Sequence, residues 1–280
     1  MSRNMITVPS ETPRKSYLYL KEKISSNKKA TIVISGGGCF IVVCLIVVVV
    51  TFVTCNSAVT AEKEGLFVIP SGNIKFNPNQ KSTYEEEISS LNQFFIDYYN
   101  NATKADDTQV IKCPPGVEPN ATQVCILPEK ILGHECNPEN VWNYNTTSPC
   151  IILSYNGKTN RTTKFDPYDD INELPNQMPK LIKDKIKQIY FEENNTMQEV
   201  IWVSCTFIGI HSYYGPGFPK SFFSNTNLPG YRKPIVALQL ILKDEINTTV
   251  EITCNMWAKG IDNGKTSETS VKFTVTVEKN

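Results

Sequence analysis

The stretch "VEITCNMW", residues 250–257, alternates between apolar and polar side chains. Because successive side chains of an extended strand point to opposite faces, this alternation predicts a strand with one buried face. The stretch "VKFTVTV", residues 271–277, shows the same pattern and predicts a second strand of this kind. The side chains expected on the two buried faces are Val250, Ile252, Cys254 and Met256, and Val271, Phe273, Val275 and Val277.

Upstream runs predict three further strands, "CIILSY" at 150–155, "EVIWVSC" at 199–205 and "PIVALQLIL" at 234–242. The last run is apolar enough to be buried on both faces. Two helices are predicted by "STYEEEISSLNQFFIDYY" at 82–99 and "MPKLIKDKIKQIYF" at 178–191. Several antiparallel strands preceded by one helix fit a β-sandwich. The apolar face of the first helix is expected to carry Ile88, Leu91, Phe94, Phe95 and Tyr98.

A different kind of segment precedes this region. The stretch "TIVISGGGCFIVVCLIVVVVTFV", residues 31–53, contains no charged residue and is long enough to cross a bilayer as a helix. A cleaved signal peptide is the alternative, but its apolar core is normally shorter and ends in a small-residue cleavage site. Residues 1–30 carry seven Lys and Arg against two Glu. Positive charge stays in the cytoplasm, which predicts a type II single-span membrane protein.

This topology divides the chain into four parts. We expect a basic cytoplasmic tail at 1–30, a transmembrane helix at 31–53, an extracellular stalk at 54–80 and an extracellular disulfide-bonded, glycosylated domain at 81–280. Anionic lipid of the inner leaflet accounts for the positive charge of the tail, so membrane lipid is an expected partner and a nucleic-acid partner is not. Glycosylation motifs support the orientation, because all six follow the span. They lie at Asn101, Asn120, Asn145, Asn160, Asn194 and Asn247.

The cysteines point to the same compartment. Cys39 and Cys44 lie inside the predicted span. Cys55 lies at its outer edge, where it is either a buried or lipid-facing thiol or part of an intermolecular bridge. An even number of cysteines in an oxidising compartment suggests three disulfides, although six cysteines allow fifteen pairings. No C-x-x-C motif is present, which argues against a zinc site. The six outer cysteines are Cys113, Cys125, Cys136, Cys150, Cys205 and Cys254.

Signs of catalysis are missing from the sequence. It contains no D-x-D, G-x-S-x-G or H-E-x-x-H motif and no P-loop. His134 and His211 are the only histidines, and neither has a nearby candidate nucleophile apart from cysteines expected to be bridged. We therefore expect no catalytic residues, no metal and no cofactor, and a recognition or structural role instead. A type II lumenal enzyme remains an alternative, because many lumenal glycosyltransferases share this topology.

Several segments resemble one family in order and in content. They are "GLFVIPSGNIKFNPNQKSTYEEEISSLNQFFIDYY", "SPCIILSYNGKTNRTTKFDPYDDINELPNQMP", "VIWVSC", "SYYGPGFPKSFF", "GYRKPIVALQL" and "VEITCNMWA". Together they are similar to beta subunits of sodium/potassium-transporting and related proton/potassium-transporting P-type ATPases, particularly invertebrate members. The tail and the span depart from the family's pattern, so the chain resembles a divergent member.

The resemblance implies both a fold and a function. It implies an immunoglobulin-like antiparallel β-sandwich with disulfides Cys113–Cys125, Cys136–Cys150 and Cys205–Cys254. It also implies a non-catalytic subunit that binds the catalytic alpha subunit, assists its folding and delivery to the plasma membrane, and modulates cation transport, in particular sodium/potassium exchange. The alternative is a beta-like surface glycoprotein that works in adhesion or junctions without a pump.

The stretch "SYYGPGFPKSFF", residues 212–223, is the candidate partner-binding surface. Its glycines and prolines disfavour a central strand and predict a loop. Rigid aromatic side chains are favoured anchors in protein interfaces, and the resembling region of beta subunits lies against an outer loop of the alpha subunit. Rings that fold back onto the domain's own core are the alternative. The expected partner-binding residues are Tyr213, Tyr214, Phe218, Phe222 and Phe223.

Overall fold

The computed structural model describes residues 64–100, 108–157, 165–206, 210–214, 217–261 and 268–279, the segment 210–214 by its backbone only. The expected tail, transmembrane helix, Cys55, and the motifs at Asn101 and Asn160 lie outside these residues. Within the described ranges, no helix combines the length and the apolar character that crossing a membrane requires. The described residues belong to one compact unit.

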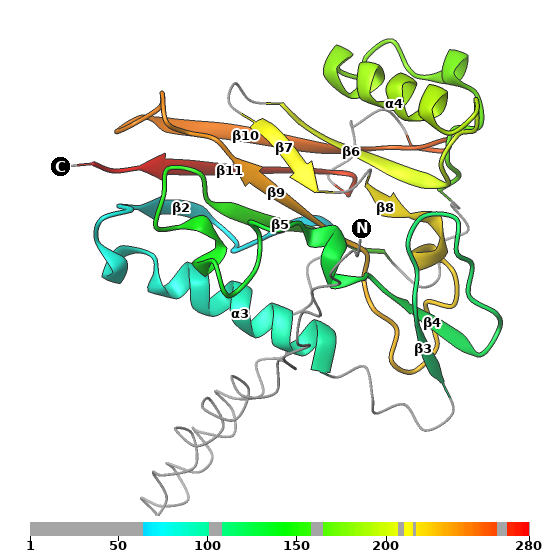
Figure 1. Ribbon diagram of the computed structural model, residues 1–280, viewed down its shortest axis with the longest axis horizontal. Coiled ribbons are helices and arrows are strands. Elements are labelled where there is room, and N and C mark those ends of the chain that lie inside the picture. Colours follow the sequence, from blue (N-terminus) through cyan, green and yellow to red (C-terminus); the bar gives the residue numbers. More distant parts are fainter. Residues whose placement is uncertain are drawn as a thin grey trace, which may run out of the picture. The chain divides into compact units, whose positions relative to one another are not determined.

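Four antiparallel strands form the first sheet, in the order β1-β5-β9-β7 (Figure 1). Their bounds are Gly65–Ile69, Cys150–Asn156, Ile235–Leu240 and Ile210–Tyr214. The central strands β5 and β9 are buried along nearly their whole length. The continuous apolar runs that predicted these two strands are thus explained by burial on both faces.

Five strands form the second sheet, in the order β2-β11-β10-β6-β8. Their bounds are Asn73–Phe76, Ser270–Val277, Thr249–Trp257, Val200–Thr206 and Phe218–Pro219. The antiparallel β10/β11 pair places Val250 opposite Val275 and Ile252 opposite Phe273. All eight apolar positions that alternation predicted on these strands are buried, which confirms both strands and their inward faces.

One hydrophobic core joins the two sheets. Ile151 and Val236 of the first sheet and Ile252 and Phe273 of the second belong to the same cluster of buried side chains. Helix α3 (Glu85–Asn100) contributes the buried residues Leu91 and Tyr98, while Ile88, Phe94 and Phe95 pack against the core. The structure therefore confirms a mainly-β domain, but two of its strands, β1 and β2, precede helix α3.

Helix α4 (Lys180–Glu192) covers the other face of the second sheet, above β6 in Figure 1. Alternation along β6 explains this, because Ile201 and Val203 join the main core while Trp202 joins a second cluster. In that cluster, Ile182 and Ile186 of α4 pack with Trp202. The helix that the sequence predicted thus closes the second sheet on its outer side.

The boundary expected between stalk and domain is wrong. Residues 65–76 fall within the expected stalk at 54–80, but they form β1 and β2. Strand β1 pairs with β5, and β2 pairs in parallel with β11. The physical reason is burial, because Leu66 and Phe76 are almost fully inaccessible to solvent. Strand β1 has five residues and β2 has four, on either side of Pro70, so each is too short to show a clear periodic pattern in the sequence.

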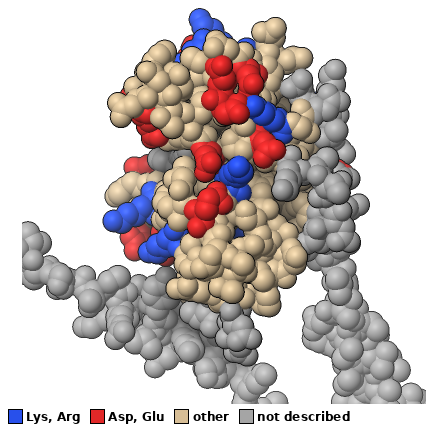
Figure 2. All heavy atoms as spheres, turned by 90° about the vertical axis from the view of Figure 1, so that its right-hand side faces the viewer, with Lys and Arg blue, Asp and Glu red and all other residues tan. Residues whose placement is uncertain are grey.

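Short elements complete the domain. Strands β3 (Gln109–Lys112) and β4 (Gln123–Ile126) form a separate parallel pair. In the described ranges, the 3-10 helices are η1 (Lys81–Thr83), η3 (Glu129–Leu132), η4 (Val141–Asn143), η5 (Ile171–Glu173) and η6 (Lys220–Phe223). Acidic and basic side chains are interspersed on the face of the molecule shown in Figure 2.

Candidate partner-binding surface

The disulfides hold the framework that carries the candidate surface. The bonds are Cys113–Cys125, Cys136–Cys150 and Cys205–Cys254, with Cα–Cα distances of 5.4, 5.5 and 3.9 Å. These are the pairs that the family resemblance implies. The first joins the ends of β3 and β4, the second joins a long loop to the start of β5, and the third joins directly opposed residues of β6 and β10.

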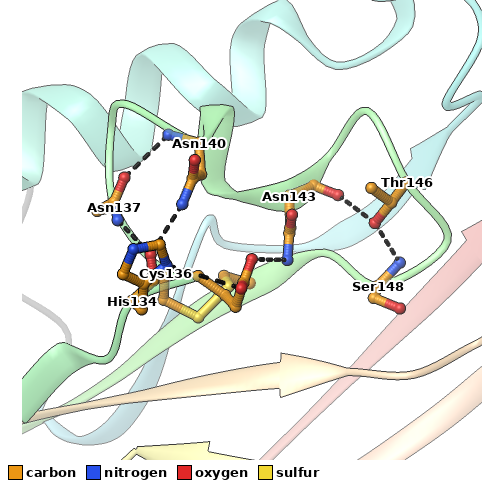
Figure 3. The surroundings of a disulfide bond; sticks show 9 residues. His134, Cys136, Asn137, Asn140, Asn143, Thr146 and Ser148 are labelled. Atoms are coloured by element: carbon orange, nitrogen blue, oxygen red, sulfur yellow. Dashed lines mark hydrogen bonds and ion pairs between the residues drawn. A yellow bond between two sulfur atoms is a disulfide. The ribbon is translucent and has the colours of Figure 1, made fainter.

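The loop between Cys136 and Cys150 is held by its own polar side chains (Figure 3). The Asn140 amide donates to the His134 carbonyl at 2.8 Å, and the Thr146 hydroxyl donates to the Asn143 carbonyl at 2.9 Å. The Trp142 indole N–H donates to Asn92 of α3 at 2.8 Å and so fastens the loop to the helix. These bonds fix the conformation of the loop and attach it to its neighbours in the domain.

His134 lies just before this loop and is solvent-exposed, with Glu135 as its nearest charged neighbour at 3.8 Å. Both flanking cysteine positions of the loop are disulfide-bonded and supply no thiolate. In the part of the chain that the structure describes, no group of three or more His, Cys, Asp or Glu side chains could hold a metal ion.

The aromatic stretch 212–223 is not the loop that its glycines and prolines predicted. Its first part belongs to β7, whose backbone pairs with β9 so that Tyr213 lies opposite Leu238 and Tyr214 opposite Ala237. Its second part forms β8, which pairs with the end of β6, and the 3-10 helix η6 follows. The stretch therefore adds one edge strand to each sheet.

Gly217 permits this arrangement. Its φ of +128° favours glycine, and a Cβ at this position would lie 2.3 Å from the carbonyl oxygen of Ile201. The absence of a side chain lets the segment approach the backbone of β6 closely enough for β8 to pair. The glycine that suggested a loop thus makes the strand possible.

Two of the five expected anchors are wrong. Phe218 and Phe222 are both 0% exposed and belong to the main core. Strand β8 turns Phe218 inward, and the following 3-10 helix brings Phe222 to the same side. Phe223 is half-buried and packs against Tyr155 and Phe165, with ring centroids 5.8 Å apart in each case. The Tyr213 and Tyr214 side chains lie outside the described atoms, so their role stays a prediction.

Sequence reasoning missed two exposed apolar side chains on α4. Leu181 is 76% and Phe191 is 64% exposed, and both lie away from the helix face that carries Ile182 and Ile186. The signal was available, because neither residue fits the spacing of the buried pair. These two exposed side chains lie near opposite ends of α4, outside the stretch 212–223.

An ion-pair cluster fixes the segment that leads into α4. The Lys259 ammonium contacts the carboxylates of Asp169 and Glu173, the latter at 2.6 Å. The hydrogen bond from Lys259 lowers the pKa of Asp169. The pKa of Lys259 is raised, mainly by this hydrogen bond to Asp169 and next by the one to Glu173. Burial raises the pKa of the nearby Tyr168 hydroxyl to about 12. Backbone bonds between Asp166 and Lys259 reinforce the attachment.

A basic side chain caps the end of α3. Arg232 Nε donates to the Tyr98 carbonyl at 3.0 Å, and burial lowers the pKa of this guanidinium. The Tyr98 hydroxyl accepts from the Leu127 amide at 3.2 Å, and the Tyr99 hydroxyl donates to the Leu127 carbonyl at 3.1 Å. Burial is the largest cause of the raised pKa values of both tyrosines. These bonds position α3 against the segments after β4 and before β9.

The exposed positions of the domain include four of the expected glycosylation motifs. Asn120, Asn145, Asn194 and Asn247 all lie on the surface. Three disulfides on a mainly-β core are typical of the class of disulfide-bonded domains that form in oxidising compartments.

The sequence pattern of the family described as "Sodium / potassium ATPase beta chain" matches residues 38–276. The chain therefore belongs to the sodium/potassium ATPase beta-chain family. It is 27% identical to sodium/potassium-transporting ATPase subunit beta-1 of Drosophila melanogaster over 197 residues, 67% of this chain and 59% of that protein. It is 28% identical to subunit beta-2 of the same organism over 200 residues, 67% of this chain and 60% of that protein. The chain thus spans about three fifths of the curated relatives it matches.

Proposed function

We propose that this chain is a non-catalytic beta subunit of a P-type cation-transporting ATPase, of the sodium/potassium-exchanging kind. It binds the catalytic alpha subunit, assists its folding and delivery to the plasma membrane, and modulates cation transport. The observation that carries the proposal is the family match over residues 38–276, which includes all six outer cysteines. The two Drosophila relatives are named as beta subunits of a sodium/potassium-transporting ATPase, which supports the proposal.

The proposal includes a topology and a fold assignment. The amino terminus is cytoplasmic, residues 31–53 span the membrane once, and the disulfide-bonded domain is extracellular with an immunoglobulin-like arrangement. The two packed sheets and the three disulfides support the fold assignment. The mechanism is binding alone, so any dependence on sodium, potassium, magnesium or ATP belongs to the partner.

The docking residues are proposed at the edge of the first sheet. Tyr213 and Tyr214 lie on β7, which in the described part of the chain is the last strand of its sheet. An edge strand keeps one row of backbone groups available to a partner. Phe223 on η6 is a further proposed docking residue; its ring is half-buried and packs against Tyr155 of β5.

Delivery of the alpha subunit tests the function. An alpha subunit is expressed alone and together with this chain, and the alpha subunit at the cell surface is then quantified. The expected result is a several-fold rise in surface alpha subunit on co-expression. Unchanged surface alpha subunit, with this chain itself at the surface, would instead favour the adhesion glycoprotein. Sugar-nucleotide binding by the purified chain would favour the lumenal enzyme.

A further inference from the structure

Asn247 is the first residue of a glycosylation motif, and its side-chain amide is hydrogen-bonded to another part of the domain. Its Oδ1 accepts a hydrogen bond from the Lys279 amide at 3.0 Å, and its Nδ2 donates to the Lys279 carbonyl at 3.2 Å. Its own backbone N–H donates to the Val277 carbonyl at 2.8 Å. The side-chain amide thus pairs with the backbone after β11 as a neighbouring strand would.

The hydroxyl of the same motif is engaged as well. Thr249 occupies the third position, begins β10, and shares a hydrogen bond of 2.9 Å with the Thr276 hydroxyl of β11. An acceptor motif for N-glycosylation consists of the Asn amide and a hydroxyl two residues later. At Asn247, both groups are therefore bound to β11 or its extension.

The motif at Asn120 provides the contrast. The Thr122 hydroxyl donates to Asn120 Oδ1 at 3.0 Å, so the amide and hydroxyl of that motif bond to each other. The Thr122 backbone N–H also donates to this oxygen, at 2.9 Å. This motif can therefore be modified without removing another element from the domain.

The segment Val277–Lys279, which binds the Asn247 side chain, is itself held by contacts with β2. The Glu278 amide donates to the Phe76 carbonyl of β2 at 2.7 Å, and the Glu278 carboxylate pairs with Lys75 at 2.8 Å. Ile246 and Val277 form a further backbone bridge. These contacts keep the segment in place in the folded domain, where it can bind the Asn247 side chain.

Amide geometry makes the two uses of Asn247 mutually exclusive. Because Oδ1 and Nδ2 bond to the same residue, the donated hydrogen of Nδ2 is the one on the side of Oδ1. In a secondary amide, the substituent on nitrogen lies trans to the carbon chain and hence on the side of the oxygen. A sugar on Nδ2 would take the place of the hydrogen that Lys279 accepts.

We propose that Asn247 is a folding-controlled modification site, which either binds the segment Val277–Lys279 or carries an N-glycan. Glycosylation joins Nδ2 to the anomeric carbon of a lipid diphosphate-linked oligosaccharide. The bond from that carbon to the diphosphate oxygen breaks, the lipid diphosphate leaves, and Nδ2 gives up one proton. The folded domain keeps Asn247 unmodified, while a chain in which this segment has not yet docked is a substrate.

The inference rests on the extracellular topology of the proposed function, and glycan mapping tests both. The full-length chain is produced in a eukaryotic secretory pathway, and occupancy at each asparagine is measured by peptide mass spectrometry. In the native chain, the ratio of glycosylated to bare Asn247 should be at least about tenfold below that of Asn120, a difference of about 1.4 kcal/mol.

The matched variants both remove the Lys279 side chain and differ in whether the backbone donor is kept. Lys279→Pro removes the N–H that Asn247 Oδ1 accepts, whereas Lys279→Ala keeps it. Occupancy of Asn247 should rise about tenfold in Lys279→Pro, as expected for the loss of one or two hydrogen bonds, and stay unchanged in Lys279→Ala. A second measurement needs no substitution, because synthesis under reducing conditions delays disulfide-dependent folding and should also raise occupancy at Asn247.

The outcomes separate the two claims. Glycan at Asn120 and equally at Asn247 in the native chain would overturn the inference and leave the topology intact. Unchanged occupancy of Asn247 in Lys279→Pro and under reducing conditions, with glycan at Asn120, would overturn it too. A chain without glycan at any of its motifs would refute the extracellular topology, and the inference with it.

Discussion

Cys205 and Cys254 lie directly opposite each other on the neighbouring antiparallel strands β6 and β10, with their Cα atoms 3.9 Å apart. The disulfide between them therefore fastens two strands that also share backbone hydrogen bonds, and it closes the longest of the three disulfide loops, with a sequence separation of 49 residues. Cys254 is fully buried in the core that both sheets share.

We expect Cys254→Ser to impair folding more than Cys125→Ser. In the chain-entropy description, closing a separation of 49 residues rather than 12 stabilises the native state by about 1 kcal/mol more. Surface delivery and thermal unfolding of the two variants measure the difference. Non-reducing peptide mapping that linked Cys113 to Cys254 would contradict the pairing itself.

Gly217→Ala should destabilise the domain by about 1–3 kcal/mol, because the new Cβ would meet the Ile201 carbonyl while the backbone holds a positive φ. The control is Gly116→Ala, since Gly116 also has a positive φ, but a Cβ added there would have no atom within 4 Å. Thermal unfolding of the purified variants compares them. Equal losses at both positions would show that close approach to β6 is unimportant.

Phe222→Ala should act as a core substitution. Removing this fully buried ring should cost about 3–5 kcal/mol of unfolding free energy and reduce surface delivery. The neighbouring half-buried Phe223 should cost less when replaced by Ala, because part of its ring already faces solvent. If Phe222→Ala unfolded like the native chain, the position of η6 against the core would be incorrect.

The burial of Phe222 and Phe218 shows what local sequence could and could not predict. The alternation of "VEITCNMW" and "VKFTVTV" predicted β10 and β11 because one face of each strand is buried along its whole length. The burial of Phe218 could not be read locally, because it depends on the close approach of Gly217 to the backbone of β6. Strand β1, which falls within the expected stalk, was likewise not predicted, because it is stabilised by its pairing with β5, far along the chain.

The Lys259 cluster predicts a pH-dependent attachment of the segment before α4. The lowered pKa of Asp169 means that its contribution is present above its ordinary value of 3.8 and is lost as the pH falls through the folded-state pKa. The raised pKa of Lys259 means that its contribution is present below its ordinary value of 10.5 and is lost as the pH rises further. The attachment should therefore hold between these limits.

Hydrogen exchange at the Asp166 and Lys259 amides, corrected for intrinsic rates, measures this attachment. Lys259→Gln should lower protection at neutral pH, and its difference from the native chain should shrink as Asp169 becomes protonated. The control is Lys272→Gln, which removes an exposed pair with Glu251 elsewhere on the sheet. Equal effects of the two substitutions would contradict a specific role for Lys259.

Tyr214→Ala should weaken assembly with the alpha subunit by about 2 kcal/mol without unfolding the domain, as loss of an interface anchor would. The comparison is Leu181→Ser, which changes an exposed apolar residue on α4 and should leave both folding and assembly unchanged. Co-precipitation from mild detergent measures assembly. Loss of assembly in Leu181→Ser alone would move the docking surface from β7 to α4.

The central claim is that this chain binds a catalytic subunit, and affinity isolation of the full-length chain from membranes tests it most directly. In mild detergent, the isolated material should contain a stoichiometric P-type ATPase alpha subunit and hydrolyse ATP in a manner stimulated by sodium and potassium together. A correctly glycosylated, disulfide-bonded chain that is recovered at the cell surface without such a subunit or activity would contradict the account.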